Sequence, residues 1–498
     1  MNYIGISAGF HDAAVTLLDD RGNILFAGHS ERYNKHKHTK HLCMDIVNDA
    51  LSYATSCDVE THYYERPLLK YLRQLRSGEK PVLANLSARE IIGTRYMHQI
   101  EDGRKKKIHT HGHHLSHAAA GFQTSPYDDA TVVVIDAIGE FDTVSIYNAY
   151  YDKNGIAKYK KLWGRSYPDS IGLFYSAMTK RVGLRPLDEE YILMGMAAYG
   201  STTSLKEMSN ALVKSFKHIT FKDNLQIGVP DNFLEGTDNM DIAHSTQLIA
   251  EQLITSVISK AKSLSNSKNL VYGGGVALNC LANRLLGEFY DNIWIMPNPG
   301  DAGSSLGAAC LGYGKRVNWT YAFLGYDISG PYPTNRILDY LITDKIVGVA
   351  SGRAEFGPRA LGNRSLLADP RGTEIKDKVN EIKRRQKFRP FAPVILEEYA
   401  DMYFDMPHGF SNSRYMQVIA RCRHTQLFPA IVHADGTSRV QTVPKDGSGI
   451  RELLEKWYVL TGCPMLLNTS LNIRGEPMVN NREDADRFEK LYNVTVIS

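Results

Sequence analysis

The chain has 498 residues, of which 43% are hydrophobic and 22% are charged. This balance is typical of a folded globular protein, so it excludes a long disordered chain or a fibrous repeat, and the length suffices for roughly two large domains or three average ones. The formal net charge of +4 at pH 7 is too small to indicate a polyanionic partner unless basic residues gather locally.

The cysteines and the apolar segments bear on the cellular compartment. The six cysteines lie far apart without a C-x-x-C pair, so we expect neither a zinc knuckle nor a redox motif. The N-terminus lacks the basic and apolar regions of a signal peptide, and no apolar run reaches about 18 residues. We therefore expect a cytoplasmic protein without a membrane partner.

The N-terminal half contains a repeated order of predicted elements. Residues 3–28 read as strand, loop, strand, turn and strand, and residues 131–160 repeat that order. The first loop of one copy holds His11 and Asp12, and that of the other holds Asp136. This organisation resembles that of the actin, sugar-kinase and Hsp70 (ASKHA) class of ATPases, in which paired glycine loops hold nucleotide phosphates. Two unrelated β-meanders are the alternative interpretation.

A long helix and two glycine loops follow the second copy. Residues 241–264 carry apolar residues at helical spacing, which predicts a helix with one face in the core. Predicted strands at 270–272 and 293–296 each run into a loop, and helices are expected at 281–289 and from residue 304. Because open α/β sheets bind ligands at the carboxyl ends of their strands, both loops are candidate sites. The loop residues of interest are Gly274, Gly275, Asn279, Asp301 and Gly303.

The C-terminal part differs in composition. Residues 325–335 are rich in Gly, Pro and Asn and predict a linker, so we place a domain boundary near residue 340. Beyond it, arginines stand beside glycine, proline and apolar residues, as at Arg359, Arg364 and Arg389. Guanidinium groups bind pairs of phosphate or carboxylate oxygens, so this pattern favours a pocket for a multiply charged anion over a solvated surface.

A pair of histidines suggests a metal site. His113 and His117 are four residues apart in a stretch that favours helix, so both can face one ion. Asp136 and Asp301, each predicted at the end of a strand, are the candidate third and fourth ligands. The alternative is a histidine-rich surface, and we expect the histidines at 109–111 to be exposed to solvent.

Several longer motifs run through the whole chain. The C-terminal ones are GRAEFGPRALGNRS, FRPFAP and LLNTS, at 352–365, 388–393 and 466–470. The N-terminal ones are FHDAA, HHLSHA, MGMAAYG and GGVALN, which begin at residues 10, 113, 194 and 274. Together, and in this order, they resemble the NodU/CmcH-type O-carbamoyltransferase family over nearly the full length.

The resemblance implies two α/β domains and a reaction. An ASKHA-type ATP- and metal-binding domain is expected at 1–340, and a YrdC-like carbamoyl-phosphate-binding domain at 341–498. The implied reaction moves the carbamoyl group of carbamoyl phosphate to an acceptor hydroxyl through a carbamoyl adenylate. It uses ATP with Mg²⁺ and a further divalent metal, typically Fe²⁺. Adenylation is chemically reasonable because AMP is a better leaving group than hydroxide, and the domains can shield the intermediate from water.

The resemblance also assigns residues to four roles. The metal ligands are His113, His117, Asp136 and Asp301. The ATP-binding residues are Gly139, Gly274, Gly275, Asn279 and Gly303. The carbamoyl-phosphate-binding residues are Arg359, Arg364, Lys383, Arg389 and Arg439. The candidate catalytic residues are His11, Asp12 and Lys37, with the general base left open.

The acceptor is the least determined part of the prediction. We expect a small molecule such as a sugar or a natural product. A hydroxymethylated pyrimidine in a nucleotide or in DNA is the alternative, and the basic run at 104–107 offers charge for DNA. A non-catalytic nucleotide-binding regulator is the alternative of another class, although the arginine-rich C-terminal part argues against it. The sequence leaves a homodimer open.

Overall fold

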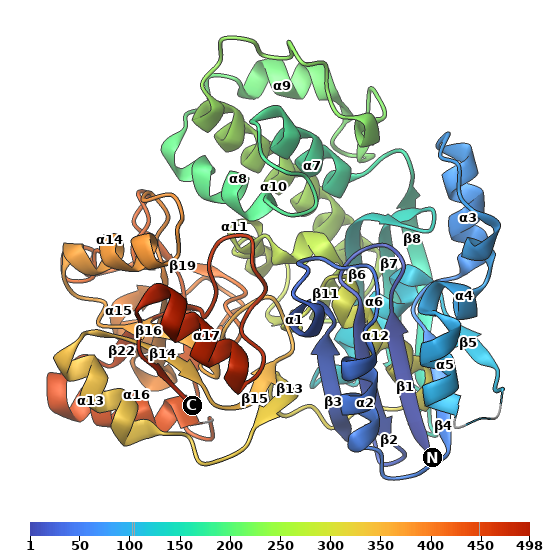
Figure 1. The fold of residues 1–498 in the computed structure, drawn as a ribbon. Coiled ribbons are helices and arrows are strands. Elements are labelled where there is room, and N and C mark those ends of the chain that lie inside the picture. Colours follow the sequence, from blue (N-terminus) through green and yellow to red (C-terminus); the bar gives the residue numbers. More distant parts are fainter. Residues whose placement is uncertain (102, 104, 448) are drawn as a thin grey trace.

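The computed structural model describes residues 1–101, 103, 105–447 and 449–498, which form an N-terminal and a C-terminal part side by side (Figure 1). Arg104, in the basic run considered for DNA binding, lies outside the described residues. Within the described chain, no helix has both the length and the apolar character needed to cross a membrane.

Two five-stranded sheets build the N-terminal part and share one strand order. In each, the first strand is central, pairs antiparallel with the second strand and pairs in parallel with the fourth. The predicted repeat is therefore confirmed. The first sheet consists, in spatial order, of β3 (Ile24–His29), β2 (Ala14–Asp19), β1 (Asn2–Ser7), β4 (Val59–Tyr63) and β5 (Ile108–Thr110). The second consists of β12 (Asn292–Trp294), β11 (Asn269–Gly273), β6 (Asp129–Gly139), β7 (Asp142–Tyr151) and β8 (Ala157–Ser166).

Helices α6 (His113–Thr124) and α12 (Ser304–Tyr313) pack against each other, α12 on the first sheet and α6 on the second (Figure 1). In the chain, each helix follows the fifth strand of the other sheet: α6 follows β5, and α12 follows β12. Glycines permit the close approach: a Cβ on Gly307 would lie 1.8 Å from the carbonyl oxygen of Ser116, and a Cβ on Gly5 would lie 1.9 Å from a carbonyl oxygen of α12. The tight packing fixes where the two helices begin.

A helical region lies between β8 and β11 in the chain and rises above the sheets in Figure 1. Its longest helix, α10 (Asn239–Leu264), confirms the helix predicted at 241–264, and residues of its apolar stripe such as Leu253 and Val257 are fully buried. The other elements are α7 (Ile171–Arg181), α8 (Glu190–Met196), α9 (Leu205–Leu212), β9 (Val213–Ser215) and β10 (Thr220–Phe221).

A mixed six-stranded sheet forms the centre of the C-terminal part. Neighbouring residues of its strands face two cores: Val347 packs with helices α13 and α16, whereas Ile346 packs with α14 and α17. The strands are, in spatial order, β21 (Gln441–Val443), β17 (Ala392–Leu396), β22 (Met465–Ser470), β16 (Arg364–Ala368), β14 (Ile346–Ala350) and β23 (Val496–Ile497). The helices are α13 (Thr334–Thr343), α14 (Thr373–Ile382), α16 (Gly449–Thr461) and α17 (Arg482–Tyr492).

Shorter elements complete the two parts. Beside the first sheet lie α1 (Glu31–Asn34), α2 (Met44–Ser52), α3 (Pro67–Arg76), α4 (Ala88–Ile92) and α5 (Thr94–Glu101). The C-terminal part adds α15 (Ala400–Tyr403) and a small sheet of β18 (Phe404–Asp405), β19 (Ile419–Cys422) and β20 (Thr437–Arg439).

The segment expected as a linker at 325–335 is instead structured at both ends. It contains most of β13 (Phe323–Ile328), which pairs with β15 (Gly352–Glu355), and the start of α13. Leu324 and Ile328 are buried, so burial of apolar side chains outweighs the turn-forming composition. Residue 340 lies within α13, which packs on α16 and β14.

The helix predicted at 281–289 is also wrong in its extent. The chain forms only the short α11 (Cys280–Asn283) and then a 3₁₀ turn at Leu286–Glu288. Gly287 lies so close to the carbonyl group of His408 that a Cβ would come within 1.7 Å of its oxygen. This contact with the C-terminal part accompanies the break in the predicted helix.

Candidate active site

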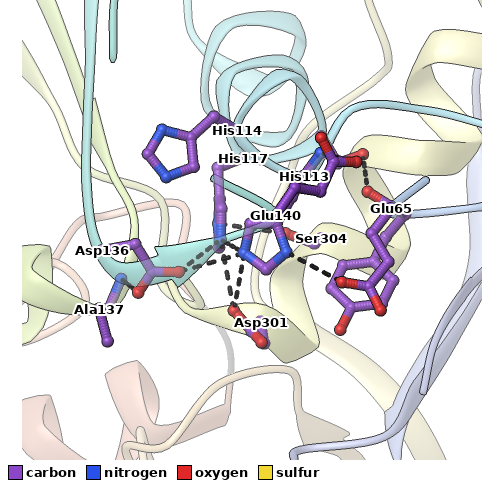
Figure 2. Close-up of polar contacts among 12 residues, drawn as sticks. Glu65, His113, His114, His117, Asp136, Ala137, Glu140, Asp301 and Ser304 are labelled. Atoms are coloured by element: carbon purple, nitrogen blue, oxygen red, sulfur yellow. Dashed lines mark hydrogen bonds and ion pairs between the residues drawn. The ribbon is translucent and has the colours of Figure 1, made fainter. Parts of the chain in front are cut away.

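Four predicted residues meet where the two central helices begin (Figure 2). His113 opens α6, His117 stands one turn later, Asp136 lies on β6, and Asp301 lies in the 3₁₀ turn just before α12. All four are buried, and one ligand atom from each lies within 4.8 Å of the others. The fold thus assembles these residues, here called the metal-ligand group, from distant parts of the chain.

The distances within this group suit a shared ion. His113 Nε2 lies 3.1 Å from Asp136 Oδ2 and 3.4 Å from Asp301 Oδ1, and 3.1 Å separates it from His117 Nε2. His117 Nε2 lies 3.6 Å and 3.4 Å from the same two carboxylate oxygens. Two ligand atoms about 2.1 Å from one ion lie about 3.0 to 3.4 Å apart at angles between about 90° and 110°. The donor set therefore fits a divalent metal.

Neighbouring side chains orient the two imidazoles (Figure 2). His117 Nδ1 lies 3.1 Å from Ser304 Oγ, and His113 Nδ1 lies 3.6 Å from Glu65 Oε2. The hydrogen bond between Ser304 and Nδ1 holds the His117 ring with Nε2 toward the other ligands, as is usual for metal-binding histidines, whereas Glu65 contacts His113 Nδ1 only at ion-pair distance. His114, in contrast, points away from the group.

Opposite charges within the group determine its protonation. Burial lowers the pKa of His113, but the carboxylates of Asp301 and Asp136 outweigh burial and hold that pKa well above its ordinary value. Burial raises the pKa of Asp136, but contacts with His113 and His117 outweigh it and hold this pKa well below its ordinary value. The carboxylates are therefore ionised at neutral pH. A metal ion bound by these four side chains would displace the protons that the two histidines hold.

The metal-ligand group adjoins a cavity of about 430 Å³ that is lined by both parts of the chain. The residues that line the cavity include predicted catalytic, metal-binding, ATP-binding and carbamoyl-phosphate-binding residues. They are His11, Asp12, Lys37, Asp136, Gly275, Asn279, Asp301, Arg359, Lys383, Arg389 and Arg439.

Six basic residues of the C-terminal part line the cavity. Arg474 pairs with Glu189 at 2.6 Å, and the other five are Arg359, Lys383, Arg385, Arg389 and Arg439. Burial, together with Arg439 and Arg389, lowers the pKa of Arg359 to about 9. Burial, Arg385 and Arg389 lower the pKa of Lys383 well below its ordinary value. Among the described residues, no carboxylate forms an ion pair with any of the five. Crowded cations without acidic partners indicate an anion-binding site.

A chain of hydrogen bonds forms another wall of the cavity. Asp12 Oδ2 lies 2.9 Å from His11 Nδ1, and Asp12 Oδ1 lies 2.7 Å from His38 Nδ1. His38 Nε2 lies 3.1 Å from Asp188 Oδ1, which also accepts a hydrogen bond from Lys37 Nζ at 2.6 Å. His11 Nε2 lies 3.7 Å from a carboxylate oxygen of the metal-ligand group. The chain therefore connects that group with Lys37.

Two residues of the glycine loop that follows β11 reach the cavity. The Gly275 N–H donates to Asp136 Oδ1 at 3.2 Å, which ties the loop to the metal-ligand group. The Asn279 side-chain amide donates to Gln247 Oε1 at 3.0 Å and caps α11. Both positions leave backbone or amide groups next to the cavity, where a nucleotide could contact them.

Gly139, Gly274 and Gly303, which are predicted to bind ATP, are not among the residues that line the cavity. A Cβ on Gly139 would lie 2.5 Å from the His113 ring, and those on Gly274 and Gly303 would lie 2.2 Å and 1.7 Å from backbone carbonyl oxygens. The Gly274 N–H already donates to the carbonyl group of Pro299 at 2.9 Å. These glycines allow the loops behind the cavity to pack closely.

Arg364 is likewise not among the residues that line the cavity. Its side chain is fully buried and absent from the cavity wall. The guanidinium donates at 2.9 to 3.1 Å to the backbone carbonyl groups of Tyr326, Ser351, Gly352, Asn363 and Asn480. The structure thus uses the donors of Arg364 to join loops of the C-terminal part, and its binding of carbamoyl phosphate stays a prediction.

Several residues of the site were not singled out in the sequence. Arg385 stands two positions after Lys383 and packs its guanidinium 4.0 Å from the centre of the Phe391 ring. The basic run around it was the available signal. No sequence pattern marks Asp188 or Glu65 as residues of the site. Asp188 contacts Lys37 and His38, and Glu65 contacts His113, which lie in other regions of the chain.

Comparison with known proteins follows this geometry. The Carbamoyltransferase N-terminus model matches residues 2–310, and the Carbamoyltransferase C-terminus model matches residues 338–497. The uncharacterized protein sll1178 of Synechocystis sp. is 33% identical, with 97% of this chain and 93% of the relative covered. The nodulation protein NolNO of Sinorhizobium fredii is 29% identical over 95% of this chain and 76% of its own. The 3'-hydroxymethylcephem-O-carbamoyltransferase of Amycolatopsis lactamdurans is 29% identical over 77% of this chain and 78% of its own. The resemblance seen in the motifs is confirmed, and the chain belongs to the carbamoyltransferase family.

Proposed function

We propose that this enzyme uses ATP to transfer the carbamoyl group of carbamoyl phosphate to a hydroxyl group of a small molecule, through a carbamoyl adenylate. The observation that carries the proposal is one cavity that is lined by five basic residues without acidic partners and by Asp136 and Asp301, the two aspartates of the adjoining metal-ligand group. A wall for anions near a site for a cation suits a reaction between two phosphate-containing substrates.

The proposed reaction has three balanced steps. Water attacks carbamoyl phosphate and yields carbamate and inorganic phosphate. A carbamate oxygen then attacks the α-phosphorus of ATP, and pyrophosphate leaves. Finally the acceptor hydroxyl attacks the carbamoyl carbon, its proton passes to a base, and the bond to AMP breaks. Enclosure between the two parts would protect the adenylate from hydrolysis.

We assign the donor site to the arginine-rich wall of the proposed YrdC-like domain. Arg359, Arg389 and Arg439 present guanidinium groups that can hold phosphate oxygens in pairs. Lys383 Nζ is fixed by a hydrogen bond to Asn472 Oδ1 at 2.7 Å and by contacts with Ser470. These cations would position the donor and stabilise the departing phosphate.

We assign the nucleotide site to the N-terminal part. The duplicated strand order supports an ASKHA-type domain, and Gly275 and Asn279 line the cavity on that side. A second donor group of Asp12, Glu31 and His38 has ligand atoms within 4.8 Å of one another. Its two carboxylates suit the Mg²⁺ that accompanies ATP.

The metal-ligand group would hold the further divalent ion. Imidazole with carboxylate donors suits iron(II), which we propose here. When bound, the ion supplies positive charge that stabilises anionic oxygens of the substrates. Ser304, hydrogen-bonded to Nδ1, would keep the His117 imidazole directed at the ion, and the nearby Glu65 carboxylate would face Nδ1 of His113.

Next to this group, His11, Asp12 and Lys37 are the proposed catalytic residues. Asp12 fixes His11 through Nδ1, which leaves Nε2 directed into the cavity beside the metal-ligand group. Burial lowers the pKa of His11, but Asp301 and Asp12 raise it to about 9, so at neutral pH this imidazolium would donate a hydrogen bond to an anionic oxygen of the substrates, and the base for the acceptor hydroxyl stays open. Lys37 adds a positive charge near the same wall.

The small-molecule acceptor is supported by the relative named for 3'-hydroxymethylcephem, whose hydroxyl belongs to a small molecule. The test is incubation of the full chain with ATP, carbamoyl phosphate and a panel of hydroxylated sugars, natural products, hydroxymethylpyrimidine nucleotides and DNA, followed by mass spectrometry. Carbamoylated sugars or natural products support the proposal. Carbamoylation confined to nucleotides or DNA would favour the alternative acceptor, and ATP binding without any carbamoylated product would favour a regulator.

A further inference from the structure

An apolar surface lies outside the cavity, on α3 and on the 3₁₀ turn at Leu83–Leu86 that packs against it. Six aliphatic side chains of this segment are between 40% and 75% exposed, and we call them the leucine face. They are Leu68, Leu72, Leu75, Val82, Leu83 and Leu86. These residues are not among those that line the cavity, and α3 lies at the right edge of the molecule in Figure 1, away from the C-terminal part.

The orientation of α3 is the reverse of that of an ordinary surface helix. Leu68, Leu72 and Leu75 recur at helical spacing and form one stripe, and this stripe faces solvent. The opposite face of the helix is buried and holds Lys70 and Arg73. The helix therefore directs its charged side chains into the protein and its apolar side chains outward.

Ion pairs hold the helix in this orientation. Lys70 Nζ donates a hydrogen bond to Glu65 Oε1 at 2.5 Å and lies 5.4 Å from the centre of the Phe10 ring. Arg73 forms an ion pair with Glu79. Turning the leucines inward would break these pairs and leave the buried Glu65 without its partner, so the apolar stripe stays outward. Exposed apolar side chains in a continuous patch mark a surface that a protein or a membrane covers.

The exposed charges beside the leucine face are almost all positive. Among the described residues of 66–107, the exposed acidic residue is Glu90. The exposed basic residues are Arg66, Arg76, Lys80, Arg95, Lys105 and Lys107. Arg89 of α4 donates to the backbone carbonyl group of Lys106 at 2.9 Å, and α4 packs on the 3₁₀ turn of the leucine face. This contact keeps the basic residues at 105–107 on the same side of the protein, so the surface suits an anionic partner.

We propose that the leucine face binds the surface of a membrane that contains anionic phospholipids. The aliphatic side chains would enter the boundary between headgroups and acyl chains, and the surrounding cations would contact the lipid phosphates. A second copy of the chain fits less well, because two such faces would bring like charges together. Nucleic acid fits less well too, because interfaces with DNA are polar and would leave the leucines uncovered.

A surface contact of this kind does not need a spanning segment. The prediction that the chain has no membrane partner concerns signal peptides and apolar runs long enough to cross a bilayer. A helix that lies in the interface needs neither of them, because only one of its faces enters the lipid. The leucine face and the cavity share no residue, so the inference does not depend on the proposed function.

The test is co-sedimentation of the full chain with lipid vesicles in the absence of substrates. The chain should bind vesicles of equimolar phosphatidylcholine and phosphatidylglycerol at least about fivefold more tightly than vesicles of phosphatidylcholine alone. Leu72→Gln/Leu75→Gln should weaken this binding roughly tenfold or more. The matched control is Val459→Gln/Leu460→Gln, at exposed aliphatic residues of α16, which should bind as the unaltered chain does. No binding to the anionic vesicles, or equal binding by the Leu72→Gln/Leu75→Gln variant, would overturn the proposal.

The contribution of charge is tested separately. Arg76→Gln/Lys80→Gln should weaken binding about fivefold for each charge removed, and added salt should weaken binding of the unaltered chain. Lys378→Gln/Arg421→Gln, at exposed residues of the C-terminal part, is the control. Binding that neither salt nor the Arg76 and Lys80 changes reduce would refute recognition of anionic lipid. Light scattering reports self-association of the same samples. A dimer that the Leu72→Gln/Leu75→Gln change dissociates, without vesicle binding, would assign the face to a second copy and overturn the proposal.

Discussion

Replacement of two arginines from the same motif should have opposite consequences. Arg359 lines the cavity among other cations, whereas Arg364 is fully buried and bonded to five backbone carbonyl groups. We expect Arg359→Gln to fold normally and to weaken carbamoyl phosphate binding, because it removes charge-assisted hydrogen bonds. Loss of about 1.5 to 3 kcal/mol corresponds to an affinity roughly ten- to more than a hundredfold lower.

The stability of the two variants should differ just as clearly. Arg359→Gln relieves repulsion with Arg439 and Arg389, so its unfolding free energy should stay unchanged or rise. Arg364→Ala removes five hydrogen bonds of about 1 kcal/mol each and leaves buried carbonyl groups without a donor, so it should lose about 3 to 5 kcal/mol.

The assays are calorimetric titration with carbamoyl phosphate and urea denaturation of each variant. Arg421→Gln, a change at an exposed arginine of the same part, is the matched control and should alter neither quantity. The reasoning fails if Arg359→Gln binds carbamoyl phosphate as tightly as the unaltered protein. It also fails if Arg364→Ala keeps full stability and instead loses carbamoyl phosphate affinity.

Three further predictions concern the metal, the nucleotide and pH. His113→Ala and His117→Ala should each lose one equivalent of metal and all turnover, and full activity of the double variant in metal-free buffer would contradict this. Each carbamoylated product should be matched by one AMP and one pyrophosphate in chromatographic analysis, whereas ADP would exclude the adenylate. Burial lowers the pKa of His38, but hydrogen bonds to Asp12 and Asp188 raise it to about 10. With an unfolded value of about 6.5, its stabilising effect should be complete below that pH and lost as pH rises through about 10. Urea denaturation should therefore show the stability gap between the unaltered protein and Asp188→Asn narrowing toward pH 10, and a constant gap would contradict this.

The sequence predicted the fold best where periodicity and repetition were strong. The repeated strand order at 3–28 and 131–160 and the long α10 need only local patterns to be recognised. The linker predicted at 325–335 differs from the structure because it was inferred from the Gly, Pro and Asn content alone. The pairing of β13 with β15 depends on a partner strand that local composition does not reveal.

Within the site, local spacing located His113 and His117, and strand ends suggested Asp136 and Asp301. Local composition could not distinguish Arg364 from Arg359, an arginine of the cavity wall, because both stand near glycine in one motif. Which of them faces the cavity depends on how the loops fold back over the sheet. Asp188 was missed for a related reason: its partners, Lys37 and His38, lie in another region of the chain.

The start of α6 and the start of α12 are equivalent positions in the duplicated part, since α6 follows β5 and α12 follows β12, the fifth strands of the two sheets. One copy places a histidine there and the other an aspartate, and these two side chains face each other across the line where the helices touch. If the N-terminal part arose by duplication of one ancestral unit, a homodimer of that unit would have placed identical residues on the two sides of this helix contact. Fusion into one chain would have allowed the two halves to diverge, so that an imidazole and a carboxylate now stand where symmetry would have required two identical side chains.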